Sequence, residues 1–235
     1  DMYANVTVPI PKSLKKDPSQ TPKWAKPANK LSPNRIRKIM PPYYGMVKCI
    51  DDNVGRVLKA LEQHGILDNT VVVFTSDHGD LCGEHCRLNK GLPYEGSAKI
   101  PFLVRYPAKV PAGTVVDEAL SCVDFLPSVL ALMGIKTAGK EQGRDASALL
   151  RGEEVRDWED VTFIRSTSGS PWFCAVSDDH KLVYSQSDSP WLFDLAQDPD
   201  ELTNYYGQDS HREVARKLAR ALRAYCDTYG DPFGS

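Results

Sequence analysis

The sequence predicts an α/β fold followed by a small antiparallel sheet, and three patterns support this prediction. Apolar residues recur at helical spacing between Tyr43 and His64, and Gly65 follows where such a helix would end. The apolar run Val71–Phe74 comes directly after a turn signal and predicts a strand that is buried on both faces. Beyond residue 155, short alternating segments separated by turns indicate an antiparallel sheet.

Composition narrows the class of protein. The chain has 235 residues, of which 41% are apolar and 26% are charged, and its net charge is -2. This composition is ordinary for a globular protein with a core of its own. The near-neutral charge provides no basic field for nucleic acid, and no apolar run approaches the roughly 20 residues that span a bilayer. The six cysteines are too sparse for a disulfide framework, so free or buried thiols are expected.

The other elements are predicted from the same signals. Residues 1 to about 34 are rich in proline, which forbids a long regular element and predicts an extended surface segment. In the first part of the chain, a second strand and two helices, the last of them weak, are expected at Pro101–Arg105, Asp124–Met133 and Gly143–Leu150. Four strands and a final amphipathic helix are expected at Val161–Arg165, Trp172–Val176, Lys181–Tyr184, Trp191–Leu195 and Val214–Tyr225.

The stretch that points to chemistry begins where the first predicted strand ends. In open α/β sheets, ligands bind beyond the carboxyl ends of strands. Asp77 and His78 are adjacent oxygen and nitrogen donors, which suit a divalent cation that holds an anionic oxygen. Gly79 allows the backbone to approach a ligand closely, and Lys90 supplies a positive charge for the same anion. The alternative is that residues 77–80, ending in Asp80, are only a polar turn after a strand.

Four blocks of sequence occur in an order that one enzyme family shares. The stretch VVVFTSDHGDLCGEHCRLNKGLPYEGSAKIPFLVRYP covers residues 71–107, and the helical block at residues 50–57 precedes it. Residues 123–130 are similar to a family helix of the form VDLxPTLL. Residues 192–204 are similar to a C-terminal signature of the form LYDLxxDPxExxN. On these blocks the chain resembles the sulfatases, within the alkaline phosphatase superfamily.

The resemblance implies a fold, an activity and a site. Residues 1–155 would be the C-terminal part of the sulfatase catalytic domain, a partial alkaline-phosphatase-like α/β sandwich. Residues 156–235 would be a small α+β subdomain with a four-stranded antiparallel sheet and a helix. The parent protein would hydrolyse sulfate esters, with Asp77 and His78 as ligands of the active-site metal. Lys90 would bind sulfate oxygens, and His85 would be a second catalytic candidate near the substrate pocket. The family metal is usually calcium, but calcium prefers oxygen ligands, so manganese or zinc stays open.

Parts of the family's machinery have no counterpart in this sequence. The sulfatase nucleophile is a formylglycine made from the Cys or Ser of a C/S-x-P-x-R motif, and no such motif occurs. Two acidic metal ligands of the family's first strand, and a catalytic His and Lys, are also absent. The chain is therefore expected to be the C-terminal portion of a longer enzyme, to need the N-terminal half of the same fold, and to be inactive alone. Its substrate would be a sulfated small molecule or carbohydrate, and the family suggests a periplasmic, secreted or lysosomal location.

Three alternatives stay open. A phosphodiesterase or phosphonate monoester hydrolase uses the same scaffold. A zinc-binding structural module would use Cys82, His85 and Cys86, which place three zinc-type donors within five residues, although no fourth ligand has fitting spacing. A non-catalytic fragment that only binds a partner is the third. The remaining histidines are predicted to be solvated positions at turns or helix ends: His64, His180 and His211.

Overall fold

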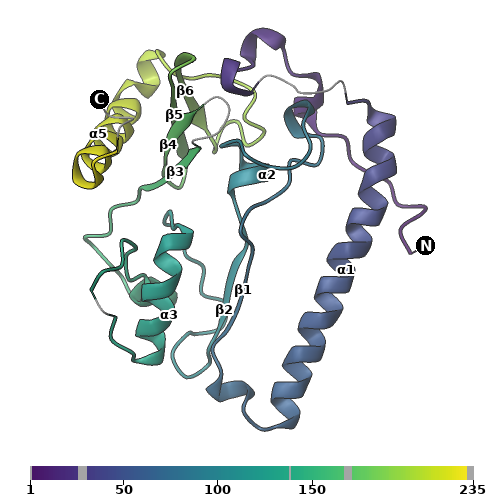
Figure 1. The fold of residues 1–235 in the computed structure, drawn as a ribbon, viewed down its shortest axis with the longest axis vertical. Helices are drawn as coiled ribbons and strands as arrows, with labels where there is room; N and C mark the ends of the chain where they lie inside the picture. Colours follow the sequence, from purple (N-terminus) through teal and green to yellow (C-terminus); the bar gives the residue numbers. More distant parts are fainter. Residues whose placement is uncertain (1, 26–30, 138, 167–170, 232–235) are drawn as a thin grey trace.

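The chain forms a two-stranded and a four-stranded antiparallel sheet, with helices beside both (Figure 1). The computed structural model describes residues 2–25, 31–137, 139–166 and 171–231. The helices are α1 (Pro33–Gln63), α2 (Glu95–Ala98), α3 (Phe125–Met133), α4 (Ser147–Leu150) and α5 (Arg212–Tyr229). The strands are β1 (Val72–Thr75), β2 (Phe102–Arg105), β3 (Thr162–Ser166), β4 (Trp172–Val176), β5 (His180–Ser185) and β6 (Asp188–Asp194). The predicted α/β class and the four-stranded C-terminal sheet with its helix are confirmed.

Helix α1 is long and begins earlier than the sequence predicts. Ser32 caps it, because its side chain accepts a hydrogen bond from a backbone N–H of the first turn. Pro33 occupies that turn, where its missing N–H removes no helical hydrogen bond. The helix then continues through Pro41 and Pro42. The prediction placed the start at Tyr43, because the helical spacing of apolar residues is recognised only from there; the predicted end of the helix is confirmed.

The β1–β2 ribbon is only partly covered. Its strands pair antiparallel, with Thr75 opposite Phe102. On the outside, Phe74 is 36% exposed and Leu103 is 64% exposed. On the other side, the rings of Phe102 and Phe125 meet edge to face at 5.8 Å, which joins the ribbon to α3. The expectation of a strand buried on both faces is therefore wrong, because the face of the ribbon that carries Phe74 and Leu103 is exposed.

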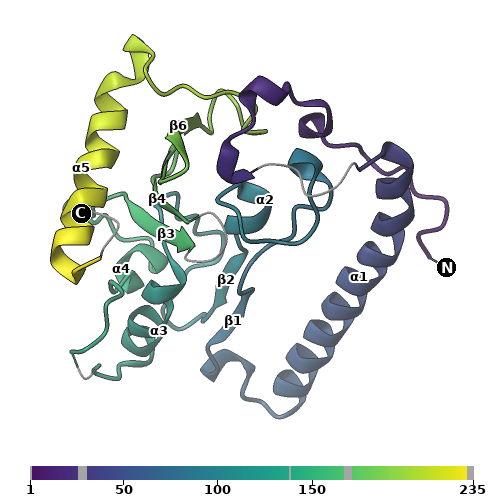
Figure 2. The same cartoon turned by 45° about the horizontal axis from the view of Figure 1, so that its top comes forward.

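The four-stranded sheet, in contrast, is buried on both faces. Its order is β3-β4-β5-β6, and each neighbouring pair is antiparallel. Helix α5 lies along one face in both ribbon views (Figure 1 and Figure 2), through a cluster that includes Phe173, Leu182, Leu192, Leu218 and Leu222. The opposite face packs on the N-terminal segment and on the loop after β1, through a cluster that includes Trp24, Leu81, Tyr94, Trp172 and Phe193. Successive side chains of each strand point to opposite sides of the sheet, so both faces carry apolar residues.

Part of the N-terminal segment belongs to the core, so the prediction of a surface segment is wrong for residues such as Leu14, Trp24 and Ala25, whereas residues 4–7 are exposed as predicted. It forms three short 3-10 turns at Lys12–Lys15, Pro18–Gln20 and Lys23–Ala25. Trp24 is 4% exposed and Ala25 is fully buried against the sheet. Proline spacing correctly forbids a long element, but it does not tell whether a segment is covered. Residues 1 and 26–30 of the predicted segment lie outside the described residues.

The predicted boundary near residue 155 falls between α4 and β3. The hydrophobic cluster on the inner face of the large sheet joins residues from both sides of that boundary, such as Leu81 and Trp172. The division into two domains stays a prediction. Among the described residues, none of the helices combines the length and the apolar composition that crossing a bilayer requires.

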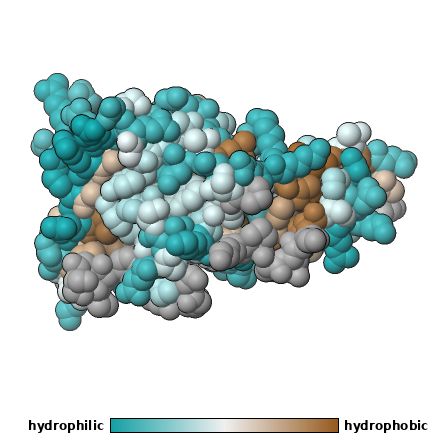
Figure 3. Space-filling model, turned by 90° about the horizontal axis from the view of Figure 1, so that it is seen from above, coloured by the Kyte–Doolittle hydropathy of each residue, from teal (hydrophilic) through white to brown (hydrophobic). Residues whose placement is uncertain are grey.

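Apolar side chains remain exposed along α1. Met46, Val47, Ile50 and Val57 are each more than half exposed. Figure 3, which views the molecule from above, shows hydrophobic surface on the side where α1 lies. Large contiguous apolar surfaces are uncommon on monomeric proteins, because burying them is favourable.

Candidate functional site

Asp77 and His78 present two donor atoms just after β1. The Asp77 side chain is 84% exposed and the His78 side chain is 38% exposed. The Nδ1–H of His78 donates a hydrogen bond to the carbonyl oxygen of Gly79 at 2.7 Å. Because a carbonyl oxygen only accepts, Nε2 carries the lone pair in the neutral ring. This Nε2 lies 3.4 Å from Oδ2 of Asp77, so the end of the strand holds a nitrogen and an oxygen donor side by side.

These two donors fit a shared divalent cation. Protein ligands bind such ions at about 2.0–2.6 Å, which places neighbouring ligand atoms roughly 3 Å apart. Desolvation raises the pKa of Asp77, but the facing His78 and hydrogen bonds from backbone N–H groups hold it below its ordinary value. The carboxylate is therefore ionised at neutral pH. Two ligands do not complete a coordination shell, so the remaining ligands must be other residues or water.

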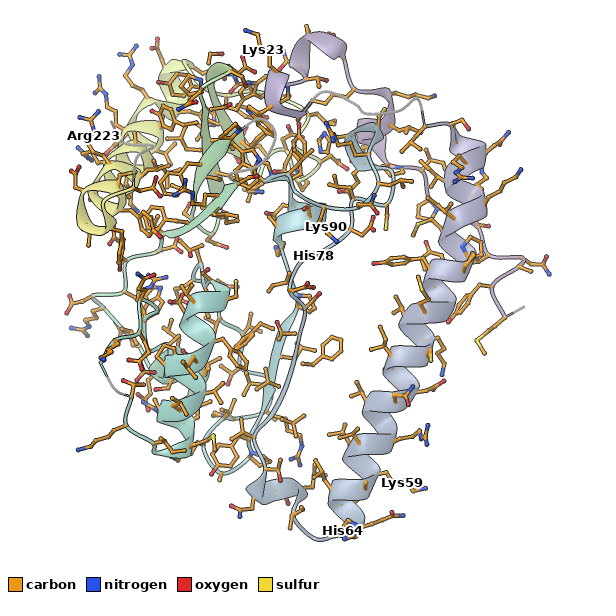
Figure 4. All side chains as sticks on the ribbon, in the orientation of Figure 1. Lys23, Lys59, His64, His78, Lys90 and Arg223 are labelled. Atoms are coloured by element: carbon orange, nitrogen blue, oxygen red, sulfur yellow. The ribbon has the colours of Figure 1, made fainter. Side chains whose placement is uncertain are left out.

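Ser97 joins the segment that carries these donors to the loop that carries Lys90. Its backbone carbonyl accepts the N–H of Gly79 at 2.9 Å, and its hydroxyl accepts the N–H of Gly91 at 3.1 Å. Gly79 follows His78 and Gly91 follows Lys90, so one buried serine holds both segments. Figure 4 shows His78 and Lys90 at the same end of the β1–β2 ribbon, beside α2.

The side chain of Lys90 is available for an anion. Lys90 is exposed, and in the part of the chain that the structure describes it has no ion pair. The loop around it is shaped by Asp80, whose Oδ1 accepts the backbone N–H groups of Cys82 at 2.8 Å and Asn89 at 3.1 Å. An ammonium group without an internal partner can neutralise the oxygens of a bound sulfate or phosphate.

Two glycines allow the backbone to pack closely at this point. A Cβ atom at Gly79 would overlap the carbonyl oxygen of Gly96. A Cβ atom at Gly96 would in turn overlap the carboxylate of Glu84. Neither glycine has a positive φ, so the requirement is for space. The predicted close approach at Gly79 is therefore found, but here it is to α2 of the same chain.

A fully buried lysine ties this loop to the large sheet. Lys181 lies on β5 and is 0% exposed. Its Nζ donates to the carbonyl oxygen of Pro93 at 2.6 Å and to the carboxylates of Glu95 and Glu201, each at 2.8 Å. The second oxygen of Glu201 accepts the backbone N–H of Glu95 at 2.7 Å. The three N–H donors of the ammonium group are thus all used, and two of their acceptors belong to the loop and α2.

Opposite charge outweighs desolvation at this lysine. Burial by itself lowers the pKa of Lys181, but the carboxylates of Glu201 and Glu95 raise it above its ordinary value. For Glu95, burial raises the pKa, and the charge and hydrogen bond of Lys181 hold it below its ordinary value. Lys181 and Glu95 therefore form a charged pair, and removal of the lysine would leave the buried carboxylate of Glu201 without the ammonium group it contacts.

His85 lies in the core. It is 6% exposed, and its ring stacks on Tyr94 with a centroid separation of 3.5 Å and an interplanar angle of 5°. Its Nδ1 is buried without a hydrogen-bond partner among the described residues. Burial, with the charges of Lys16 and Lys181, lowers the pKa of His85 to about 3, so the ring is neutral. Its role near a substrate pocket stays a prediction, as do the roles of the exposed residues.

The structure does not assemble a zinc module from Cys82, His85 and Cys86. Within the described ranges, the one group of three such donor atoms close enough to share an ion lies elsewhere in the chain. The Cys86 thiol instead donates to the carbonyl oxygen of Leu14 at 3.1 Å. All six cysteines are free thiols, as predicted.

Sequence reasoning missed the residues that hold the loop. Lys181 alternates with Val183 on the core-facing side of β5, and a lysine at such a position is a signal for a buried ionic partner. The role of Ser97 depends on how distant segments cross, and no local pattern marks it.

Comparison with known proteins finds two matching family models and several similar proteins. A family model described as Sulfatase matches residues 8–135. A second, described as N-sulphoglucosamine sulphohydrolase, C-terminal, matches residues 83–227. An arylsulfatase from Clostridium perfringens is 34% identical over 197 residues, which are 82% of this chain and 41% of that protein.

Solved structures extend the likeness to the fold. A structure of a protein in complex with its substrate D-glucosamine-2-N,6-O-disulfate matches with a TM-score of 0.74 and 28% identity, covering 84% of this chain and 42% of that one. The phosphonate monoester hydrolase of Agrobacterium radiobacter matches with a TM-score of 0.73 and 28% identity, covering 84% and 43%. The predicted alkaline-phosphatase-type fold is confirmed, and the chain spans about two-fifths of the length of these proteins.

Replacing Lys181 by Met is expected to lower the free energy of unfolding by about 3–5 kcal/mol, because it removes the ammonium group that pairs with the buried carboxylate of Glu201 and the half-buried carboxylate of Glu95. Urea denaturation would measure this change. The matched control is Lys99→Met, since Lys99 also pairs with Glu95, at 3.5 Å, but is 78% exposed. Its cost is expected to stay below about 1 kcal/mol. Equal costs for the two variants would show that the buried pair has no special role.

Replacing His85 by Phe is expected to flatten the loss of stability in acid. Between pH 6.5 and about 3, the unfolded chain takes up a proton at His85 and the folded protein does not. Stability therefore falls as pH drops below 6.5, by up to about 1.4 kcal/mol per pH unit from this group. The variant keeps an aromatic ring against Tyr94 but has no proton to bind. Denaturant midpoints from pH 7 to pH 5 would test this, and parallel curves for the two proteins would contradict it.

Proposed function

The chain belongs to the sulfatase family, and we propose that it supplies the metal-and-anion side of an active site that hydrolyses sulfate esters. In this proposal, Asp77 and His78 hold a divalent cation, and Lys90 binds the oxygens of the sulfate group. The observation that carries it is the 3.4 Å separation of Asp77 Oδ2 and His78 Nε2, with the imidazole tautomer set by Gly79. Histidines that bind a metal through one ring nitrogen commonly donate a hydrogen bond from the other.

Each residue of the chain has a separate task in this mechanism. The Nε2 lone pair and the Asp77 carboxylate bind the cation, which would be calcium or, given the imidazole ligand, manganese or zinc. Lys90 contributes its charge to the sulfate oxygens, where negative charge must be stabilised as the ester bond breaks. Ser97 keeps the two segments in register, so that the cation and the ammonium group act on the same anion.

The nucleophile must come from outside these residues. No C/S-x-P-x-R motif occurs in the chain, so a formylglycine would have to be supplied by a segment like those of the longer relatives. When present, that group supplies the oxygen that attacks sulfur. The exposed apolar residues of α1, including Met46, Ile50 and Val57, provide a surface on which the rest of such a fold would pack. On this proposal the 235-residue chain has no sulfatase turnover by itself.

We propose a sulfated carbohydrate as the substrate class. One structural relative is described with D-glucosamine-2-N,6-O-disulfate as its substrate, and one curated relative is an N-acetylglucosamine-6-O-sulfatase from Bacteroides thetaiotaomicron. The second candidate is phosphonate monoester hydrolysis, favoured by the likeness to the Agrobacterium radiobacter enzyme. Both reactions need a cation and an ammonium group on a tetrahedral anion, so the residues of this chain suit either.

In a form of the protein that carries the formylglycine segment, Lys90→Ala is expected to lower kcat/KM for an aryl sulfate by about 10²–10³-fold, because one charge on the sulfate is lost. Asp77→Asn is expected to raise the concentration of metal needed for half activity as well. Lys59→Ala is the matched control, since Lys59 is an exposed lysine at the far end of α1 (Figure 4). A Lys90→Ala enzyme as active as the control would refute the assignment. Faster turnover of a phosphonate ester than of a sulfate ester would select the second candidate.

A further inference from the structure

Three side chains converge in the C-terminal part of the chain, away from the residues assigned above. His180 begins β5, Asp194 ends β6, and His211 directly precedes α5. The strand register places His180 opposite Asp194, and α5 packs over the same sheet. One donor atom from each residue lies within 4.8 Å of the other two. Asp194 and His211 are buried and His180 is half-buried, so the prediction of a solvated position is wrong for His211 and holds only in part for His180.

The distances fit a single ion. Nε2 of His211 lies 3.0 Å from Oδ2 of Asp194, and Nε2 of His180 lies 3.7 Å from the same oxygen. Zinc binds nitrogen and oxygen at about 2.0–2.2 Å, and in a tetrahedral shell two such ligands lie roughly 3.4 Å apart. The two observed separations lie on either side of this value. Small shifts of the imidazole rings would place the two Nε2 atoms and Oδ2 at bonding distance from one ion between them.

Neighbouring hydrogen bonds orient the donors for this task. The Oγ of Ser210 lies 2.8 Å from Nδ1 of His211, which leaves Nε2 to face Asp194. The backbone and side-chain N–H groups of Gln197 donate to the two oxygens of Asp194, at 2.9 and 2.7 Å. Metal-binding His and Asp residues are usually held by such outer contacts.

An Asp–His hydrogen bond alone accounts for only part of this arrangement. A proton on Nε2 of His211 would satisfy the contact with Asp194, but it gives no role to the second imidazole, whose Nε2 faces the same oxygen. If Nδ1 of a neutral His211 ring donates to Ser210 instead, a nitrogen lone pair faces the carboxylate, and a cation between them would make that contact favourable. Two imidazoles and one carboxylate are a donor set typical of zinc and related transition metals.

We propose that His180, Asp194 and His211 form a zinc-type metal site that joins β5, β6 and the start of α5. Its fourth ligand is water, on the side where His180 is partly exposed. The site is separate from Asp77 and His78 and does not depend on the function proposed above. Because the metal binds the folded chain and cross-links three successive elements, it stabilises the C-terminal sheet.

The test is a titration of chelator-treated protein with Zn²⁺ alone, followed by calorimetry and by thermal unfolding. The Asp77→Asn variant serves as the parent, so that the first site does not contribute. It is expected to bind one Zn²⁺ per chain and to unfold at a higher temperature when loaded. His180→Asn in this parent is expected to weaken binding by at least about 10–100-fold. His180→Cys supplies another zinc ligand and is expected to retain binding.

The control is His64→Asn, because His64 is exposed at the end of α1 and far from the cluster (Figure 4). It is expected to bind Zn²⁺ as the parent does. The proposal is overturned if the Asp77→Asn parent binds no Zn²⁺, or if His180→Asn binds it as tightly as His64→Asn. If His180→Cys binds Zn²⁺ and His180→Asn does not, then the loss of binding in His180→Asn comes from the missing ligand and not from unfolding.

Discussion

The ammonium group of Lys181 has no access to water, so each of its N–H donors needs an acceptor inside the protein. The Pro93 carbonyl and the Glu95 carboxylate, which follow Lys90 in the sequence, accept two of these hydrogen bonds. The carboxylate of Glu201, which follows β6, accepts the third. A buried charge of this kind tolerates little displacement, because any separation from its partners costs several kcal/mol. The four-stranded sheet therefore determines where the loop can lie.

This constraint explains how exposed functional groups can be well positioned. Asp77 and Lys90 are exposed, but the residue that connects their segments, Ser97, is buried and lies in α2 beside Glu95. The inner face of the sheet adds apolar contacts, since Tyr94 of the loop packs on it. A binding site that projects from supported backbone loses little entropy when an anion binds. The C-terminal sheet thus acts as the support for the proposed cation and anion site.

Local patterns predicted most elements, but contacts between distant segments had to be observed. The strand at Trp172–Val176 was predictable because alternation alone decides which side chains share a face. The burial of Trp24 was not, because it depends on a sheet that begins far along the chain. The closeness of the Asp77 and His78 side chains was predictable because the two residues are adjacent, and their role as metal ligands stays a prediction. Lys181 was missed because its acidic partners are distant in sequence, although its core-facing position carried the signal.

The buried charge of Lys181 on β5 holds the loop in place. Amide hydrogen exchange at Gly79 and Gly91, whose N–H groups both bond to Ser97, measures this directly. We predict that exchange at both amides becomes faster in Lys181→Met than in Lys99→Met, while exchange in α3 is the same in the two variants. Unchanged protection at Gly79 and Gly91 in Lys181→Met would contradict the claim.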